Sequence, residues 1–205
     1  MTTRFMLARH GSCAQTENVL VGRLVDAPLD ARGEREALSL AARLEQEHPV
    51  LVLTSPRLRA RQTAAAIADY AGCPVRAVAE LDEMDFGEWS GRRFSELAHD
   101  TRWQRWNAAR ASSLTPAGDG IVAVQRRITR YLDELAAAFT GCTLALVTHA
   151  EIIRSALLAY LDVEIDDWQT IEIAPASLTA LCVTRAGVEV ESVGLRCTCE
   201  EHLAA

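Results

Sequence analysis

Two histidines follow apolar runs of the kind that form buried strands. His10 comes after the run Phe5–Ala8 and Arg9, and His149 follows the run Thr143–Thr148. The carboxyl ends of parallel strands meet at one edge of an α/β sheet, where such sheets bind their ligands. A guanidinium offers a planar fork of donors to a phosphate, and an imidazole can act as a nucleophile or carry a proton. We therefore expect an anion site at this edge.

Three further residues complete a set of side chains that could catalyse phosphoryl transfer. Gly11 would let the backbone approach an anion closely, Arg59 lies in the basic segment Ser55–Ala60, and Glu83 lies in the acidic segment Leu81–Gly87. Transfer of a phosphoryl group needs positive donors around three equatorial oxygens, a nucleophile in line and an acid for the leaving oxygen. Two arginines, two histidines and one glutamate can supply these parts.

The strands and helices that must position these residues are predicted to alternate along the chain. The apolar runs that predict strands are Phe5–Ala8, Val50–Leu53, Thr143–Thr148, Leu178–Thr184 and Val188–Val193. Apolar residues at helical spacing predict helices within residues 37–44, 60–71, 121–139 and 152–161. This order predicts an α/β fold, a three-layer α/β/α sandwich around a central, mostly parallel sheet.

Local signals mark the ends of these elements. Ser55, followed by a proline, is expected to cap the second helix, and Gly72 to end it. Asp119 is placed to cap the long third helix. The dipeptide Ala186-Gly187 predicts a hairpin between the last two strands.

Two segments lack a regular pattern. Residues 11–30 are expected to form a long loop that touches the ligand. Residues 84–118 contain three of the four tryptophans of the chain and are expected to form a lid-like excursion over the sheet edge. We expect residues 1–205 to form a single domain.

Composition narrows the possible partners. The 205 residues are 49% hydrophobic and 24% charged, as in ordinary globular domains. The formal charge of −7 argues against a general nucleic-acid or membrane-surface binder. No apolar run approaches the ~20 residues that cross a bilayer, and the first residues lack a secretory pattern, so a cytoplasmic protein is expected. Cys197, Cys199 and His202 lack the paired spacing of a strong zinc motif.

The order of these motifs resembles the histidine phosphatase superfamily, also called phosphoglycerate-mutase-like. Its Arg-His-Gly begins at Arg9, and its Ser-Pro-x-x-Arg-Ala-x-x-Thr-Ala is matched by Ser55–Ala64, the most specific part. Its Asp-x-Pro-Leu is matched by Asp26–Leu29, its Glu-x-x-x-Gly by Glu83–Gly87, and its late histidine by His149. The resemblance covers nearly the whole chain in order.

The resemblance implies a role for each matching residue. His10 would be the nucleophile that forms a phosphohistidine, while Arg9, Arg59 and His149 would hold the phosphate. It selects Glu83, among several neighbouring carboxylates, as the proton donor that protonates the departing alkoxide and then activates water. The chemistry implied uses no metal and no cofactor, and the partner is a small phosphomonoester. The chain would act as a monomer or a homodimer.

Some positions depart from the family pattern. Cys13 stands where threonine is usual, and Thr16 where an asparagine often helps to bind phosphate; Asn18, two residues on, is a substitute. Ala150 replaces the glycine that usually follows the second histidine, and Arg23 is expected to reach the distal end of the substrate. The substrate-binding residues expected beside the arginines are Gly11, Thr16, Asn18, Arg23 and Ala150.

Basic residues outside the matched positions are expected to be structural. Arg57 and Arg61 are predicted to be solvated helix residues, and Arg127 and Arg154 to be structural or rim residues rather than phosphate ligands.

Hydrolysis is favoured over the mutase reaction of this superfamily. Mutases generally carry a longer insert between the acid and the next helix, whereas here about 35 residues separate Glu83 from Asp119. A mutase must also close a basic pocket around its phosphohistidine to exclude water. The alternatives are therefore mutase-type transfer and a catalytically idle phospholigand-binding regulatory protein, although the latter would have no need of the full Arg, His and Glu set. Sugar phosphates, nucleotides, phosphoglycolate-like acids and cofactor precursors all remain candidate substrates.

Overall fold

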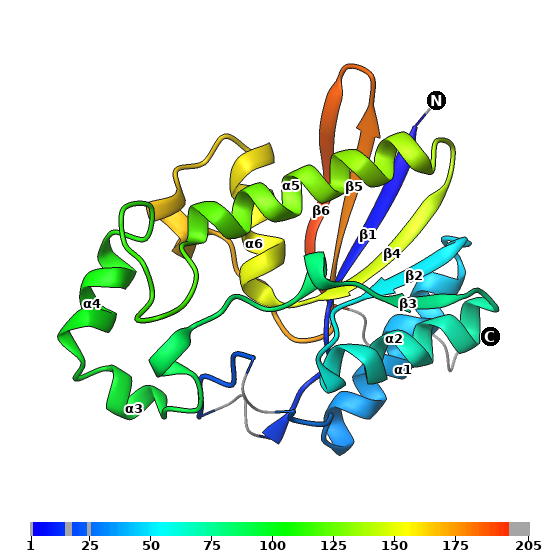
Figure 1. The fold of residues 1–205 in the computed structure, drawn as a ribbon. Helices are drawn as coiled ribbons and strands as arrows, with labels where there is room; N and C mark the ends of the chain where they lie inside the picture. Colours follow the sequence, from blue (N-terminus) through cyan, green and yellow to red (C-terminus); the bar gives the residue numbers. More distant parts are fainter. Residues whose placement is uncertain (1, 15–17, 24–25, 197–205) are drawn as a thin grey trace.

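The computed structural model describes residues 2–14, 18–23 and 26–196, and Figure 1 shows their arrangement around one six-stranded sheet. The strand order is β3-β2-β4-β1-β5-β6. β1 pairs in parallel with β4, β4 with β2 and β2 with β3, whereas β5 and β6 form an antiparallel hairpin beside β1. The strands are β1 (Thr3–Arg9), β2 (Leu51–Thr54), β3 (Val75–Ala77), β4 (Thr143–Thr148), β5 (Ser177–Thr184) and β6 (Gly187–Arg196).

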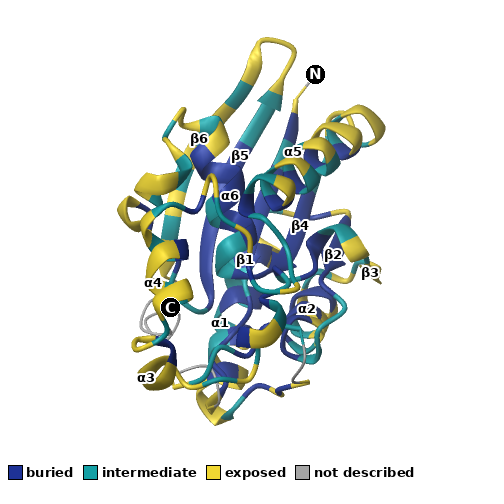
Figure 2. Ribbon diagram, turned by 60° about the vertical axis from the view of Figure 1, so that its left-hand side comes forward, coloured by how far each residue is buried: buried dark blue, intermediate teal, exposed yellow. Residues whose placement is uncertain are grey.

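Two helices cover each face of this sheet, which confirms the predicted three layers. One face carries α1 (Ala31–Glu45) and α2 (Leu58–Ala71), and the other carries α5 (Ile121–Ala138) and α6 (Ala150–Tyr160). Side chains alternate between the faces along each strand. Phe5 and Leu7 of β1 therefore pack in the α5/α6 core, and Met6 and Ala8 pack in the α1/α2 core. Both faces of β1 and β4 are buried, whereas the tip of the β5–β6 hairpin is exposed (Figure 2).

The register of β1 and β4 brings the two site histidines to the same level of the sheet. Arg9 is the register partner of Thr148, and the backbone N–H of His10 donates to the carbonyl of Thr148 at 3.0 Å. His10 and His149 each follow the last residue of these adjacent parallel strands. The sequence prediction that they meet at one edge is confirmed.

The predicted end of α2 is confirmed, but its predicted cap is wrong. Gly72 ends the helix in the left-handed conformation, with φ of 62°. Ser55 does not cap, because α2 begins at Leu58 and the Ser55 hydroxyl lies against His149. The N–H of Leu58 donates instead to the carboxylate of Asp26 at 3.0 Å.

The predicted capping role of Asp119 is also wrong. Gly120 occupies the N-cap of α5 and makes no side-chain capping bond. The Asp119 carboxylate accepts from Arg23 Nη2 at 2.9 Å and from the Asp85 N–H at 3.0 Å. A tertiary ion pair has replaced the local bond that the sequence suggested.

The segment 84–118 folds over an aromatic cluster beside the sheet edge. It contains the short helices η3 (Gly87–Trp89), α3 (Phe94–Leu97) and α4 (Thr101–Ala108). Trp89 and Trp106 are fully buried, and their rings lie 5.8 Å apart between centroids. The remaining short helices are η2 (Ala79–Leu81) and η4 (Ile165–Thr170). None of the described helices has the length and apolar character needed to span a membrane.

Candidate active site

His10 is buried at the end of β1, and two contacts fix its tautomer. Its Nδ1 lies 2.8 Å from the carbonyl oxygen of Gly11, and Arg59 Nε donates to its Nε2 at 3.1 Å. A carbonyl only accepts and a guanidinium only donates, so the proton is on Nδ1 and the lone pair is on Nε2. Burial, with the nearby charges of Arg59 and Arg9, lowers the pKa of His10 well below 6.5. Nε2 therefore carries an unprotonated lone pair on a neutral ring.

His149 lies beside His10, with 5.1 Å between the ring centroids. Its Nδ1 is 3.2 Å from Arg59 Nη2, and its Nε2 is 2.7 Å from the hydroxyl of Ser55. Arg59 can only donate, so Nδ1 accepts and the Nε2–H donates to Ser55. Burial, followed by the charge of Arg59, lowers the pKa of His149 well below 6.5.

The two arginines present donors without protein acceptors. Arg9 is held by one bond, from its Nη1 to the carbonyl of Ile173 at 2.7 Å. Arg9 Nε and Arg59 Nη1 are buried and have no hydrogen-bond partner among the described residues. An unpaired buried donor costs about 1–3 kcal/mol, more when charged. Phosphate oxygens are the acceptors that would satisfy such donors.

Glu83 faces the same groups as a buried carboxyl. Its Oε2 lies 3.5 Å from His149 Nδ1 and 3.9 Å from Arg59 Nη2, and its Oε1 accepts from the Met84 N–H at 2.9 Å. Burial outweighs the attraction of Arg59 and raises the pKa of Glu83 from its ordinary 4.5 to about 7. A carboxylic acid that titrates near neutrality suits proton donation followed by proton acceptance.

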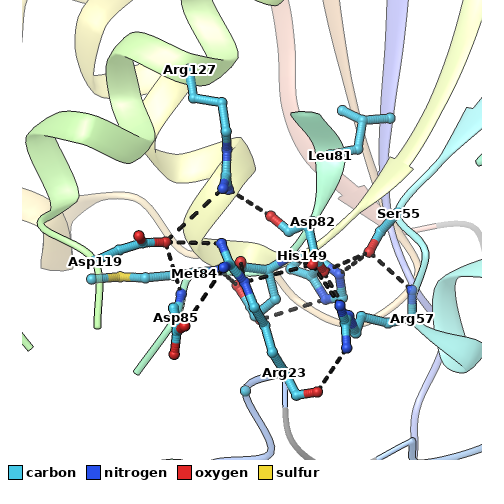
Figure 3. A network of polar contacts seen from close by, with 12 residues as sticks. Arg23, Ser55, Arg57, Leu81, Asp82, Met84, Asp85, Asp119, Arg127 and His149 are labelled. Atoms are coloured by element: carbon cyan, nitrogen blue, oxygen red, sulfur yellow. Dashed lines mark hydrogen bonds and ion pairs between the residues drawn. The ribbon is translucent and has the colours of Figure 1, made fainter. Parts of the chain in front are cut away.

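Three arginines hold the backbone around Glu83 (Figure 3). Arg23 Nε donates to the carbonyl of Glu83 at 2.6 Å, and Arg127 Nη2 donates to the carbonyl of Asp82 at 2.7 Å. Arg57 binds both carboxylate oxygens of Asp82 at 2.7 Å, and one of these oxygens accepts from the Glu83 N–H at 2.8 Å. The network fixes where the acid is presented.

This network corrects two sequence predictions. Arg23 does not reach the substrate end of the site, because its guanidinium is bonded to the Glu83 carbonyl and ion-paired with Asp119 at 2.9 Å. Arg57 is not a solvated helix residue, since it is half-buried and paired with Asp82. Both pairings depend on burial and on acidic groups that are distant in the sequence, so local sequence patterns could not predict them. The structural or rim positions predicted for Arg127 and Arg154 are confirmed.

A cavity of about 240 Å³ opens beside His10. Ala150 lines it, together with Arg9, His10, Arg59 and Glu83. The other described lining residues are Val19, Leu20, Val21, Gly22, Phe86, Phe94, Trp103, Asn107, Arg110, Glu151 and Trp168.

The structure gives Gly11 a packing role, and its predicted role in anion approach stays a prediction. Its N–H donates to the Thr63 hydroxyl at 3.1 Å, and a Cβ there would lie 2.6 Å from the carbonyl oxygen of Gly33. Gly11 therefore allows close packing of the loop on α1, and it is outside the described cavity lining.

Asn18 and Cys13, in the predicted ligand-binding loop 11–30, do not line the cavity. Asn18 is exposed and outside the described cavity lining, and its carbonyl accepts from the Phe94 N–H at 3.0 Å. Cys13 is buried in a small apolar cluster with Val21 and Leu29, where burial raises the pKa of its thiol to about 11. The prediction for Thr16 lies outside the described residues, as do Cys197, Cys199 and His202.

Sequence reasoning missed several residues that shape the cavity. Glu151 could have been found, since it lies two positions after His149 at the start of a helix. Arg110 and Trp168 come from segments far apart in the sequence, and Ser55 was assigned to the wrong partner. In the described part of the chain, no three His, Cys, Asp or Glu side chains are grouped as metal ligands would be.

An α/β sheet edge with two arginines, a neutral histidine pair and a glutamic acid is an arrangement suited to phosphoryl transfer through a histidine. The chain belongs to the histidine phosphatase superfamily (branch 1), whose family model matches residues 5–196. The sequence resemblance is thereby confirmed.

Several known relatives of the chain are phosphatases. It is 29% identical over 160 residues to the adenosylcobalamin/alpha-ribazole phosphatase of Salmonella typhimurium, covering 77% of this chain and 79% of that protein. It is 29% identical over 167 residues to phosphoserine phosphatase 1 of Hydrogenobacter thermophilus, covering 79% and 78%. The fold matches that of a mycobacterial glucosyl-3-phosphoglycerate phosphatase with a TM-score of 0.84 at 23% identity, over 95% of this chain and 99% of the other. The chain is a phosphatase, as the sequence predicted.

Proposed function

We propose that this phosphatase hydrolyses a small phosphomonoester through a phosphohistidine on Nε2 of His10. The observation that carries the proposal is the tautomer of His10, because the Nδ1–H is held by the Gly11 carbonyl and the lone pair of Nε2 faces the cavity arginines. Arg9 and Arg59 would bind the transferred oxygens. His149 would hold the same group with its Nδ1 protonated, because its Nε2–H is already bonded to the Ser55 hydroxyl.

Two chemical steps follow from this arrangement. In the first, His10 Nε2 attacks phosphorus, the bond from phosphorus to the leaving oxygen breaks, and that oxygen takes the proton of Glu83. In the second, the Glu83 carboxylate takes a proton from water as its oxygen attacks the phosphohistidine. The N–P bond then breaks, the lone pair returns to Nε2, and phosphate leaves. The Gly11 carbonyl stabilises the positive imidazole between the steps.

Residues 84–118 would act as a cover for the bound substrate. Phe86, Phe94, Trp103, Asn107 and Arg110, all from this segment, line the cavity. The single domain, the absence of a metal or cofactor requirement, the cytoplasmic location and the monomeric or dimeric state stay predictions from the sequence. The mutase alternative would require the phosphohistidine to be retained and passed back to an acceptor alcohol.

Trapping the phosphoenzyme tests the proposal. The protein is mixed with ³²P-labelled acetyl phosphate in EDTA and quenched within milliseconds, and the label is tested for the acid lability and base stability of phosphohistidine. We expect label on the wild type and none on His10→Ala. His99→Ala, at an exposed histidine, is the matched control and should be labelled normally. Label that persists in His10→Ala, or that requires an added divalent ion, would contradict the proposal.

A further inference from the structure

Arg110 lines the cavity and has a donor that none of the described residues accepts. Its side chain is 3% exposed, and its Nε is buried without a hydrogen-bond partner in the described part of the chain. The other two nitrogens are bonded, Nη1 to Glu151 Oε2 at 2.9 Å and Nη2 to Asn107 Oδ1 at 2.8 Å. Leaving a buried donor of a charged group unpaired is costly. The Nε–H of Arg110 would therefore gain from an acceptor on a ligand.

Two indole rings hold the guanidinium of Arg110 in place. Its Cζ lies over the ring of Trp106, 4.0 Å from the centroid, and over the ring of Trp168, 3.5 Å from the centroid. The N–H groups of a guanidinium point outwards in its own plane, so contacts over its face leave them free to donate. A donor that is fixed before the ligand binds loses little conformational entropy on binding.

Two arginines share one carboxylate at this end of the cavity. Glu151 accepts from Arg110 and, through its Oε1, from Arg154 Nη1 at 2.5 Å. Asp166, the next acid whose charge acts on Arg110, accepts from the Ala111 N–H at 2.9 Å and lies outside the described lining. Burial outweighs these carboxylates and lowers the pKa of Arg110 to about 10, so the group stays charged at neutral pH. An anionic group on a ligand would stabilise this charge further.

The leaving group of a phosphomonoester is the part of the substrate that would meet Arg110. The arginines and the histidine at the sheet edge would take the phosphate, and the rest of the lining is left for the leaving group. Leu20, Phe94 and Trp103 would contact its carbon atoms and exclude water, which strengthens a polar contact with Arg110. The cavity measures about 240 Å³. Sites for drug-sized ligands usually measure roughly 300–1,000 Å³, so the leaving group must be short.

We propose that Arg110 binds a carboxylate on the leaving group through its Nε–H, and that the preferred substrates are monophosphates of short hydroxy acids. This inference rests on the proposed function and names the substrate class of the same site. A carboxylate accepts a charge-assisted hydrogen bond and brings one negative charge to the pair of arginines that share Glu151. Arg110 would thus determine specificity without taking part in the bond changes.

Substrates that differ only at the distal group test the preference. 3-Carboxypropyl, 3-carbamoylpropyl and 4-methylpentyl phosphate share a primary alkyl leaving oxygen and end in a carboxylate, an amide and an apolar group of similar size. The set that is one carbon shorter is 2-carboxyethyl, 2-carbamoylethyl and 3-methylbutyl phosphate. At the better chain length, we expect kcat/KM for the carboxylate to exceed that for the apolar analogue by about 10- to 100-fold, with the amide between them. Equal values at both lengths, or a preference for the apolar analogue, would overturn the inference.

Two variants with opposite expected effects assign the preference to residues. Arg110→Gln removes the charge and the Nε–H, so the ratio of carboxylate to apolar activity should fall at least about tenfold. Glu151→Gln removes the negative charge that competes for Arg110, so the same ratio should rise at least about threefold. Arg105→Gln, at an exposed position of α4 outside the described lining, is the matched control and should leave the ratio unchanged.

Either variant can overturn the assignment. An unaltered ratio in Arg110→Gln would remove Arg110 from the proposal. If that variant does not fold, Glu151→Gln decides, because a ratio that does not rise would mean that the carboxylate does not bind beside Glu151.

The phosphoenzyme separates this inference from the proposed function. Acetyl phosphate is small and has no carboxylate, so labelling of His10 by it needs no contact with Arg110. Labelling without any preference among the matched substrates would overturn the substrate class alone. Absence of labelled His10 would overturn both.

Discussion

Arg59 Nε donates a hydrogen bond to Nε2 of His10, the nitrogen that carries the attacking lone pair, at 3.1 Å. The same guanidinium has a buried Nη1 without a protein acceptor. A phosphate that binds to the Arg59 guanidinium would accept hydrogen bonds from it. The bond from Arg59 Nε to His10 would then break, and the lone pair of His10 Nε2 would become free to attack. In the proposed mechanism, Arg59 would both restrain the nucleophile and bind the group that it attacks.

Removing Arg59 should impair every substrate. Its charge acts on the transferred phosphoryl group, which is common to all phosphomonoesters, and loss of one such donor typically costs about 10²–10³-fold in rate. We expect Arg59→Ala to lower kcat/KM by at least this much for both an alkyl phosphate and p-nitrophenyl phosphate. Arg61→Ala, at an exposed position of the same helix, is the control. A loss confined to one substrate would contradict a phosphate-binding role.

Glu83→Gln should instead separate substrates by their leaving groups. General acid catalysis is typically worth about 10²–10⁴-fold, and it matters most when the leaving oxygen is a poor one. In single-turnover measurements, the rate at which an alkyl phosphate phosphorylates His10 should therefore fall by this factor. The rate with p-nitrophenyl phosphate should stay nearly unchanged. In the wild type, the alkyl rate should fall as pH rises above about 7, because Glu83 then loses its proton. Equal losses on both substrates would mean that Glu83 positions phosphate.

The strand pattern allowed much of this site to be predicted from sequence. His10 and His149 follow apolar runs, and parallel pairing of those strands was enough to bring them together. Ser55 and Asp119 were misassigned because local capping rules favour a serine or aspartate before a helix, whereas each side chain bonds a tertiary partner that sequence distance conceals. Glu83 could be chosen among its acidic neighbours only through the family pattern, since its burial is a property of the fold.

Burial of Glu83 should also be visible in stability. Its folded pKa of about 7 lies above the ordinary 4.5 of an unfolded chain, so the folded state binds its proton more tightly. This contribution is fully present below about pH 4.5 and is lost as pH rises through 7. Glu83→Gln should thus raise the free energy of unfolding at pH 8, by up to about 3 kcal/mol at 1.36 kcal/mol per pKa unit, and change it little at pH 4.5. Urea unfolding at both pH values measures the difference, and a gain of equal size at both would rule out titration of Glu83 as its cause.

The carboxylate of Asp82 connects the acid to the arginines that hold it. It accepts from the Glu83 N–H at 2.8 Å and from Nε and Nη2 of Arg57 at 2.7 Å. The third donor, Arg57 Nη1, bonds the carbonyl of Arg23 at 2.7 Å. Asp82→Asn keeps the size of the side chain but removes its charge and replaces one acceptor with an NH₂ group. The backbone that presents Glu83 should shift, and misplacement by about 1 Å can cost 10²-fold in rate.

The expected signature of Asp82→Asn is a weaker form of that of Glu83→Gln. The rate with an alkyl phosphate should fall about 10- to 100-fold, and that with p-nitrophenyl phosphate should fall much less, because the phosphate ligands Arg9 and Arg59 are untouched. Asp69→Asn is the control, since Asp69 lies at an exposed position of α2, outside the network around Glu83. Single-turnover rates with both substrates decide the matter. Equal losses for Asp82→Asn on the two substrates would mean that Asp82 supports the phosphate site as a whole, and the acid would then owe its position to Arg23 and Arg127.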